Sequence, residues 1–162
     1  MIKRGIAVFA LAVRLFAAGA IAPGDGRADD IDAAQRGLVE RYVAAVAAQD
    51  GDNLKKLMHP ASLACISEAN RDYFDFVLTQ DLRYASALGG GYKLSSFAPI
   101  DAQNAAMTEM GGLVQNPVPP THQFQIDTPF DANNRSVTLM RVAAPLGGTW
   151  FIVTGCPTEK GL

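Results

Sequence analysis

The chain has 162 residues, of which 49% are hydrophobic and 19% are charged, and its formal charge is −2 at pH 7. This composition is typical of one globular domain with a single core, and it excludes an intrinsically disordered chain and a bundle of membrane helices. The balance of charges provides no basic surface for nucleic acid or for an anionic membrane.

The first 22 residues have the order of a secretory signal peptide. Lys3 and Arg4 precede an apolar run over residues 6–22, and this run ends in small residues. We expect signal peptidase to cut after Ala28, with cleavage after Ala20 as the alternative. The protein is therefore predicted to be exported to the periplasm or secreted.

Cleavage after Ala28 defines a signal peptide of residues 1–28 and a mature domain of residues 29–162. This domain keeps 10 basic and 15 acidic residues, a formal charge of −5. Arg14 interrupts the apolar run, and a charge at the centre of a membrane helix costs about 3 kcal/mol. No cysteine follows the run as a site for a lipid. The sequence thus predicts no stable membrane anchor.

Residues 29–67 have a helical pattern. Asp30 or Asp32 can cap a first helix, and the glycine in QDGD (49–52) can end it. Its apolar positions recur at spacings of three and four, which places them on one stripe: Leu38, Val39, Tyr42, Val43 and Val46.

A short second helix is predicted next, capped by Asp52 or Asn53 and stopped by His59 and Pro60. Its inner face would carry Leu54, Leu57 and Met58. At the end of this helix, His59 would hydrogen-bond to terminal carbonyls. A third helix is predicted over residues 70–88, with Asn70 as its cap and an apolar stripe of Phe74, Val77, Leu78 and Leu82.

Strand patterns begin after the glycines at 89–91. Residues 92–100 are the first expected strand, and residues 101–120 are a long excursion with one short turn of helix. The last part of the chain predicts a three-stranded meander, in which turns at 131–134 and 145–148 join strands at 121–130, 135–144 and 149–156.

Four-residue loops at both turns would place Phe124 opposite Arg141 and Ala143 opposite Trp150. One mostly apolar face then results, with His122 and Arg141 as its polar members. Its full set is His122, Phe124, Ile126, Thr128, Phe130, Val137, Leu139, Arg141, Ala143, Trp150, Ile152, Thr154 and Cys156. The opposite face carries Met140, Val142, Phe151 and Val153 and is a candidate homodimer surface.

The stretches LVERYVAAVAAQDGDNLKKLMHP (38–60) and SVTLMRVAAPLGGTWFIVTGC (136–156) resemble the nuclear transport factor 2-like superfamily, in a match of pattern that covers residues 30–156. The resemblance implies an α+β fold, in which N-terminal helices pack on a curved antiparallel sheet shaped like a cone. This superfamily includes isomerases, cyclases, secreted bacterial proteins, binding modules and assembly domains, so the fold leaves function open.

Two cysteines, Cys65 and Cys156, lie far apart in the sequence. In an exported protein an even pair is usually a disulfide, which here would join the helical layer to the last strand. Free buried thiols and a metal site are the alternatives. The sequence has no C-x-x-C pair and no zinc-ligand spacing, so we expect no metal and no cofactor.

Four side chains are candidates for chemistry or binding. In a pocket, His122 could act as a general base, and the alternative is a strand-end histidine bonded to backbone. Arg141 could clamp a carboxylate, while Trp150 and Tyr42 are further ligand-binding candidates. Tyr73, Tyr84 and Asp101 match no catalytic motif of the superfamily. The sequence contains neither a phosphate loop nor a G-x-S-x-G elbow.

These patterns favour an exported, non-catalytic module of the cell envelope that binds a small ligand or another protein. The ligand would be small and apolar or would carry a carboxylate. The alternative is an isomerase, cyclase or dehydratase that acts on a small molecule with His122 as general base.

Overall fold

The structure is a computed structural model that describes residues 31–129 and 135–161. The predicted signal peptide (1–28), Phe130 and the turn at 131–134 lie outside the described residues. The helices are α1 (Ala33–Ala47), α2 (Gly51–Lys56), α3 (Pro60–Ala64), η2 (Glu68–Asn70), α4 (Arg71–Leu82), α5 (Ala85–Gly89), α6 (Ala102–Met107) and η3 (Met110–Gly112). None of the helices within these ranges is long and apolar enough to cross a membrane.

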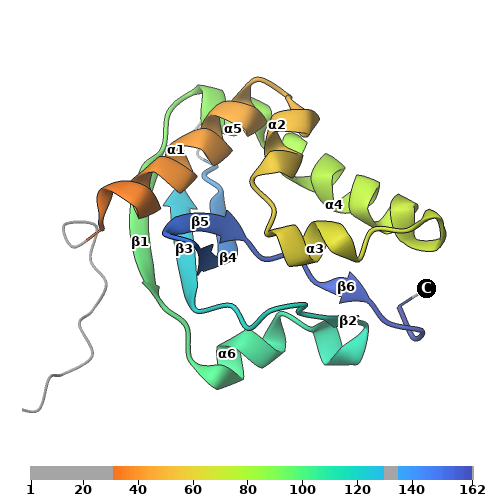
Figure 1. The fold of residues 1–162 in the computed structure, drawn as a ribbon. Coiled ribbons are helices and arrows are strands. Elements are labelled where there is room, and N and C mark those ends of the chain that lie inside the picture. The colour runs from red at the N-terminus through yellow and green to blue at the C-terminus, as the bar shows by residue number, and fades with distance from the viewer. Residues whose placement is uncertain (1–30, 130–134, 162) are drawn as a thin grey trace, which may run out of the picture.

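Within residues 31–129 and 135–161, six strands form two antiparallel sheets (Figure 1). The larger sheet has the order β1-β3-β4-β5, and the smaller pairs β2 with β6. The strands are β1 (Lys93–Pro99), β2 (Val114–Gln115), β3 (His122–Asp127), β4 (Thr138–Leu146), β5 (Thr149–Ile152) and β6 (Cys156–Pro157). The chain therefore has the predicted α+β architecture.

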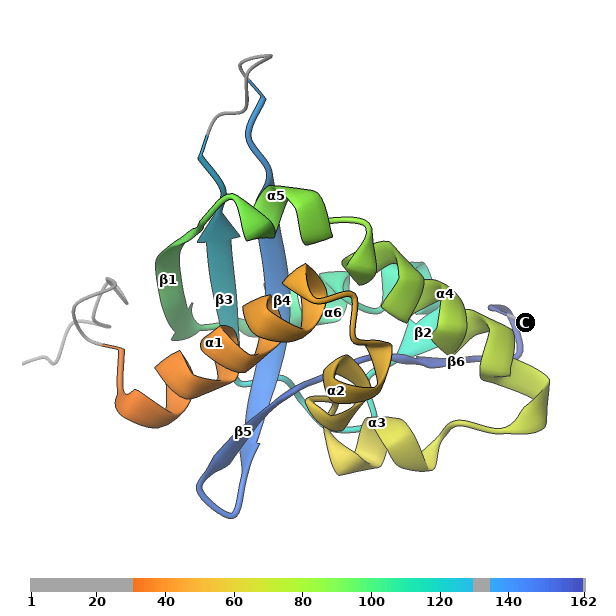
Figure 2. The same cartoon turned by 90° about the horizontal axis from the view of Figure 1, so that it is seen from above.

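Helix α1 lies across one face of the larger sheet (Figure 2), and the buried apolar side chains of the core lie between them. Tyr42 of α1 packs edge-on against Phe124 of β3, with ring centroids 5.7 Å apart. The predicted stripe of α1 is fully buried or nearly so, as are Phe124, Ile126, Leu139, Ala143 and Ile152 of the sheet. Burial of these apolar surfaces is the main force that holds the helices on the sheet.

The first helix begins as predicted but ends differently. Its cap is Asp32, whose carboxylate accepts a hydrogen bond from the Gln35 backbone N–H at 2.8 Å. The glycine of QDGD does not end α1. Gln49 takes the left-handed conformation there (φ 55°), and Gly51 is already the first residue of α2. The cap of α2 is Asp50, so the predicted caps Asp52 and Asn53 are wrong.

Two further helix predictions are wrong in their boundaries. His59 and Pro60 begin α3 instead of only ending α2, because proline is well suited to the first turn of a helix. The single helix expected over 70–88 is divided into α4 and α5, which are separated at Arg83 and Tyr84. Leu54, Leu57 and Met58 are nevertheless buried, as predicted.

The excursion at 101–120 contains the expected short helix, α6, which Asp101 caps through a 2.7 Å bond from the Asn104 N–H. It also contains β2, which the sequence analysis missed. A two-residue strand without alternation leaves no periodic pattern to detect.

The register of β3 and β4 is confirmed, with Phe124 opposite Arg141. In the second hairpin Ala143 lies opposite Ile152, whereas Trp150 was predicted there. The turn consists only of Gly147 and Gly148, both with positive φ (58° and 79°), the conformation that tight hairpins prefer. Because this register is shifted by two residues, the predicted faces are unchanged.

The strand predicted over residues 149–156 ends earlier than expected. β5 stops at Ile152, and Cys156 belongs to β6, where it pairs with Gln115 of β2. The placement of Thr154 and Cys156 on the face of the larger sheet is therefore wrong. On the opposite face Met140 is 54% exposed, whereas Val153 is buried.

Candidate functional site

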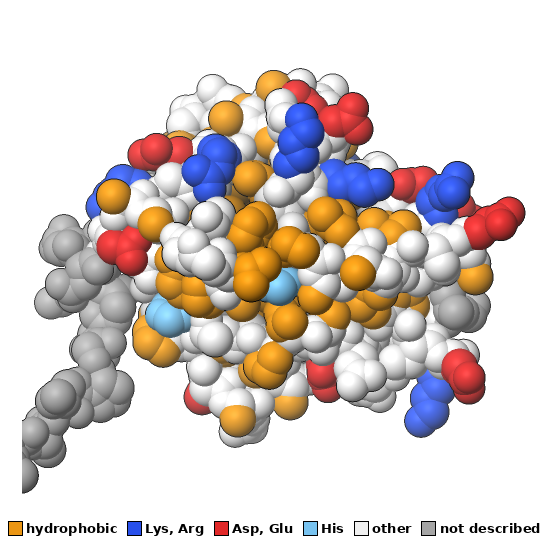
Figure 3. All heavy atoms as spheres, in the orientation of Figure 1, with side chains coloured by type: hydrophobic (Ala, Val, Ile, Leu, Met, Phe, Trp, Pro, Cys, Tyr) orange, Lys and Arg blue, Asp and Glu red, His pale blue; other side chains and the backbone are white. Residues whose placement is uncertain are grey.

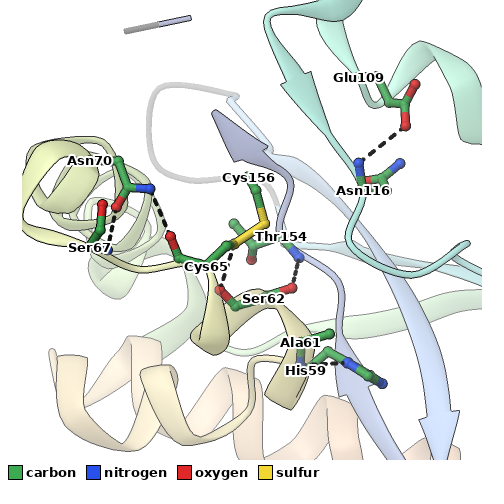
Figure 4. Close-up of a disulfide and its surroundings, with 10 residues drawn as sticks. All are labelled: His59, Ala61, Ser62, Cys65, Ser67, Asn70, Glu109, Asn116, Thr154 and Cys156. Carbon is green, nitrogen blue, oxygen red and sulfur yellow. Dashed lines mark hydrogen bonds between the residues drawn. A yellow bond between two sulfur atoms is a disulfide. The ribbon is translucent and has the colours of Figure 1, made fainter. Parts of the chain in front are cut away.

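The two cysteines meet where α3 approaches the smaller sheet (Figure 4). Cys65 follows the last residue of α3, and its sulfur lies at bonding distance from that of Cys156, with 6.1 Å between the Cα atoms. Nearby, the Thr154 N–H donates to the hydroxyl of Ser62 at 3.1 Å. These contacts make the disulfide part of a structural junction, and neither sulfur is free to hold a metal.

His59 caps α3 beside this junction. The ring Nδ1 of His59 accepts a hydrogen bond from the Ala61 backbone N–H at 3.1 Å. The backbone N–H of His59 donates to the Ile152 carbonyl at 2.8 Å. The predicted donor role at the end of α2 is therefore wrong, because Nδ1 accepts at the start of the next helix. Burial lowers the pKa of His59, since the charged ring would lose its hydration.

Replacing His59 by asparagine is expected to reduce the acid sensitivity of the protein. The unfolded chain protonates His59 near its ordinary pKa of about 6.5, whereas the folded state resists protonation. Stability is therefore lost as the pH falls through this value. Protonation also removes the cap, which is worth about 1 kcal/mol, so wild type should lose about that much more than the variant between pH 7 and pH 5. Urea unfolding at several pH values measures this difference.

His122→Gln is the matched control, because burial also lowers the pKa of His122. His59→Asn should retain some dependence of the free energy of unfolding on pH, because His122 is still present. This remaining dependence should disappear in the double variant His59→Asn/His122→Gln. If the free energy of unfolding depends on pH equally in wild type and in His59→Asn, the capping role of His59 is contradicted.

His122 lies in an aromatic cluster at the beginning of β3. Its ring centroid is 4.7 Å from that of Trp150 and 5.8 Å from that of Phe97. Nδ1 lies 3.1 Å from the Thr121 hydroxyl, and the charge of Asp32 partly opposes the lowering of the pKa by burial. Within the described ranges, no carboxylate or tyrosine hydroxyl hydrogen-bonds to this ring.

Arg141 already binds a carboxylate from the protein itself. Its Nε and Nη2 donate to both oxygens of Asp81 in α4, and its Nη1 donates to the Met140 carbonyl at 2.6 Å. Arg141 also borders a groove of about 350 Å³ between α4 and the sheet, with Tyr73 and Val142 among its other residues. The guanidinium that was predicted to bind a ligand carboxylate is therefore paired with Asp81.

Tyr42 is completely buried in the core below Arg141, whose guanidinium carbon lies 5.9 Å from the ring centroid. Burial raises the pKa of Tyr42, and the charge of Arg141 opposes this in part. Among the described residues Arg141 is a polar group that acts on this hydroxyl, although no hydrogen bond of regular geometry joins the two side chains. A buried, neutral phenol in this position belongs to the core.

Trp150 borders a larger groove of about 720 Å³ between α1, α2 and β5. Its apolar lining consists of Ala44, Ala45, Ala48, Leu57, Trp150 and Phe151, and its polar lining consists of Arg41, Asp50, Asn53, Lys56 and Thr149. Figure 3 shows basic side chains over α1 and α2, above a band of apolar side chains around β5 and α3. A volume between about 300 and 1,000 Å³ is usual for small-molecule sites.

The helical contribution to this groove has a sequence signal that the analysis missed. Arg41, Ala44, Ala45 and Ala48 follow the spacing i, i+3, i+4 and i+7, so they share one side of α1. Small side chains there leave space above β5. Of the groove residues, only Trp150 had been predicted from the sequence to bind a ligand.

No group of three or more His, Cys, Asp or Glu side chains in residues 31–129 and 135–161 is arranged to hold a metal ion. Comparison with known proteins gave no match to a family model, to a curated protein or to a solved structure.

Proposed function

We propose that the protein is a non-catalytic, small-ligand-binding module exported to the cell envelope, with the groove between α1, α2 and β5 as its binding site. The observation that carries this proposal is the combination of an apolar lining with a few polar and cationic groups in a volume suited to a small molecule. Periplasmic or secreted location is supported by the paired cysteines, because disulfides persist in oxidising compartments.

Binding can be tested with N-phenyl-1-naphthylamine, a neutral apolar fluorescent probe. Trp150 is the only tryptophan in the chain and borders the groove, so energy transfer from it reports probe binding to the protein, and groove variants then locate the site. Saturable transfer is the expected result. Ala44→Phe should weaken it, because the larger side chain occupies part of the apolar surface of the groove.

Ala47→Phe is the matched control for this experiment. Ala47 is an exposed alanine in the same helix, but it does not border the groove. This variant should therefore bind the probe like wild type. Absence of saturable transfer in wild type, or equal binding by both variants, would overturn the proposed site.

The catalytic alternative requires a proton donor or acceptor near His122. The hydroxyl of Thr121 is its hydrogen-bond partner in the described residues, and neither the groove beside Trp150 nor that beside Arg141 includes His122. These observations support binding over an isomerase, cyclase or dehydratase activity.

Two related proposals concern fold family and assembly. Membership of the nuclear transport factor 2-like superfamily is supported by N-terminal helices packed on an antiparallel sheet. A homodimer through the outer sheet face would use the exposed Met140, whereas Phe151 borders the proposed binding groove and Val153 is buried, which reduces the area available. Sedimentation of the mature protein tests this assembly.

A further inference from the structure

We infer that the ligand of the groove between α1, α2 and β5 is an anionic amphiphile, such as a medium-chain carboxylate. Its anionic group would bind between Arg41 and Lys56, and its apolar part would lie on the alanines of α1 beside Trp150 and Phe151. This inference rests on the proposed binding function and adds the chemical class of the ligand.

Both cations of the groove are available to an anion. Arg41 is exposed, and its side chain makes no hydrogen bond or ion pair with any residue in the described part of the chain. The Nζ of Lys56 donates to the neutral side-chain amide oxygen Oδ1 of Asn53 at 2.9 Å, so no negative charge compensates the ammonium group in this contact. Two cations above an apolar surface favour a ligand with a negative charge at one end.

Asp50 is the one acidic side chain that borders the groove, and both of its carboxylate oxygens accept hydrogen bonds at the start of α2. One of its oxygens accepts from the Asn53 N–H at 2.9 Å, and the other accepts from the Asn53 side-chain amide at 2.7 Å. These hydrogen bonds, together with the positive end of α2, partly compensate its charge. Asp50 therefore offsets the cations less than a free carboxylate would.

The apolar lining excludes ligands that are polar throughout. The apolar lining comes from alanines of α1 and its C-cap and from Leu57, Trp150 and Phe151. An inorganic anion would leave this surface without a complementary partner. An alkyl or aryl chain covers it and removes apolar surface from water, at about 25 cal/mol per Å².

The test is a competition experiment in which three ten-carbon compounds displace N-phenyl-1-naphthylamine from the mature protein. Decanoate is anionic, decanol is neutral and decyltrimethylammonium is cationic. Decanoate is expected to bind about tenfold more tightly than decanol, the effect of one charge-assisted contact. Its affinity should fall with added salt, whereas that of decanol should not, because salt screens exposed charges.

Substitutions test whether Arg41 and Lys56 bind the anionic group of the ligand. The double variant Arg41→Gln/Lys56→Gln should lose about tenfold in affinity for decanoate and retain its affinity for decanol and for the neutral probe. Lys55→Gln is the matched control, because Lys55 adjoins Lys56 but does not border this groove. It should bind decanoate like wild type.

The outcomes separate the ligand class from the proposed function. If decanol competes as well as decanoate, or if the double variant binds decanoate normally, the anionic class is wrong while the binding function stands. If the neutral probe itself does not bind wild-type protein, the proposed function fails and the inference fails with it.

Discussion

Replacing Cys65 and Cys156 together by serine is expected to lower the free energy of unfolding by about 4 kcal/mol. The disulfide joins residues 91 positions apart, so it restricts a long loop of the unfolded chain. Its loss leaves α3 attached to the end of the sheet mainly through Ser62 and His59, whose hydrogen bonds reach Thr154 and Ile152. Urea unfolding of the variant and of wild type without reductant measures the difference.

Two controls distinguish a disulfide from a simple substitution effect. Wild type with reductant should approach the stability of the double serine variant, and the variant itself should not respond to reductant. Intact mass after alkylation should show no modified thiols in the oxidised mature protein. Two freely alkylated thiols would contradict the pairing and would weaken the case for export.

The two hairpins show which features of strand pairing can be predicted from sequence. Alternation over β3 and β4 was enough to pair Phe124 with Arg141, because any odd slip would expose the apolar face. Alternation cannot detect a slip of two. The second turn was therefore assigned as four residues, although Gly147 and Gly148 alone can form it.

The end of the chain shows a different limit. Residues 149–156 have the pattern of one strand, but pattern alone does not identify the partner of each residue. His59 and Met58 contact Ile152 from the side opposite β4, and the chain then leaves the larger sheet toward β2. The pairing of the cysteines was predicted from compartment and number, whereas their location at this junction depends on tertiary contacts.

The groove beside Trp150 could not have been assembled from sequence. Arg41 and Lys56 lie on different helices, and the tryptophan lies on a strand about 100 residues farther along the chain. Their proximity depends on how α1 and α2 pack against β5. Arg141 was predicted to bind the carboxylate of a ligand, whereas in the structure it pairs with Asp81 of the protein itself. This pairing was not predicted, because long-range ion pairs have no local pattern.

Loss of the ion pair between Arg141 and Asp81 is expected to have the second large effect on stability. Arg141→Met is expected to lower the free energy of unfolding by about 3 kcal/mol, because it leaves the Asp81 carboxylate buried without its counter-ion. The Asp81 side chain is 10% exposed and that of Arg141 is 26% exposed, so we expect a value at the low end of the range for buried pairs. Urea unfolding at pH 7 measures the change.

The double variant Asp81→Leu/Arg141→Met distinguishes the cost of an unpaired charge from the value of the pair. Apolar replacements of similar size remove both charges, and such substitutions are often neutral or stabilising, so the double variant should recover to within about 1 kcal/mol of wild type. A double-mutant cycle then yields a large coupling energy between α4 and β4. If the single variant loses less than about 1 kcal/mol, water already compensates Asp81, and Arg141 would be free to bind an external carboxylate as the sequence first suggested.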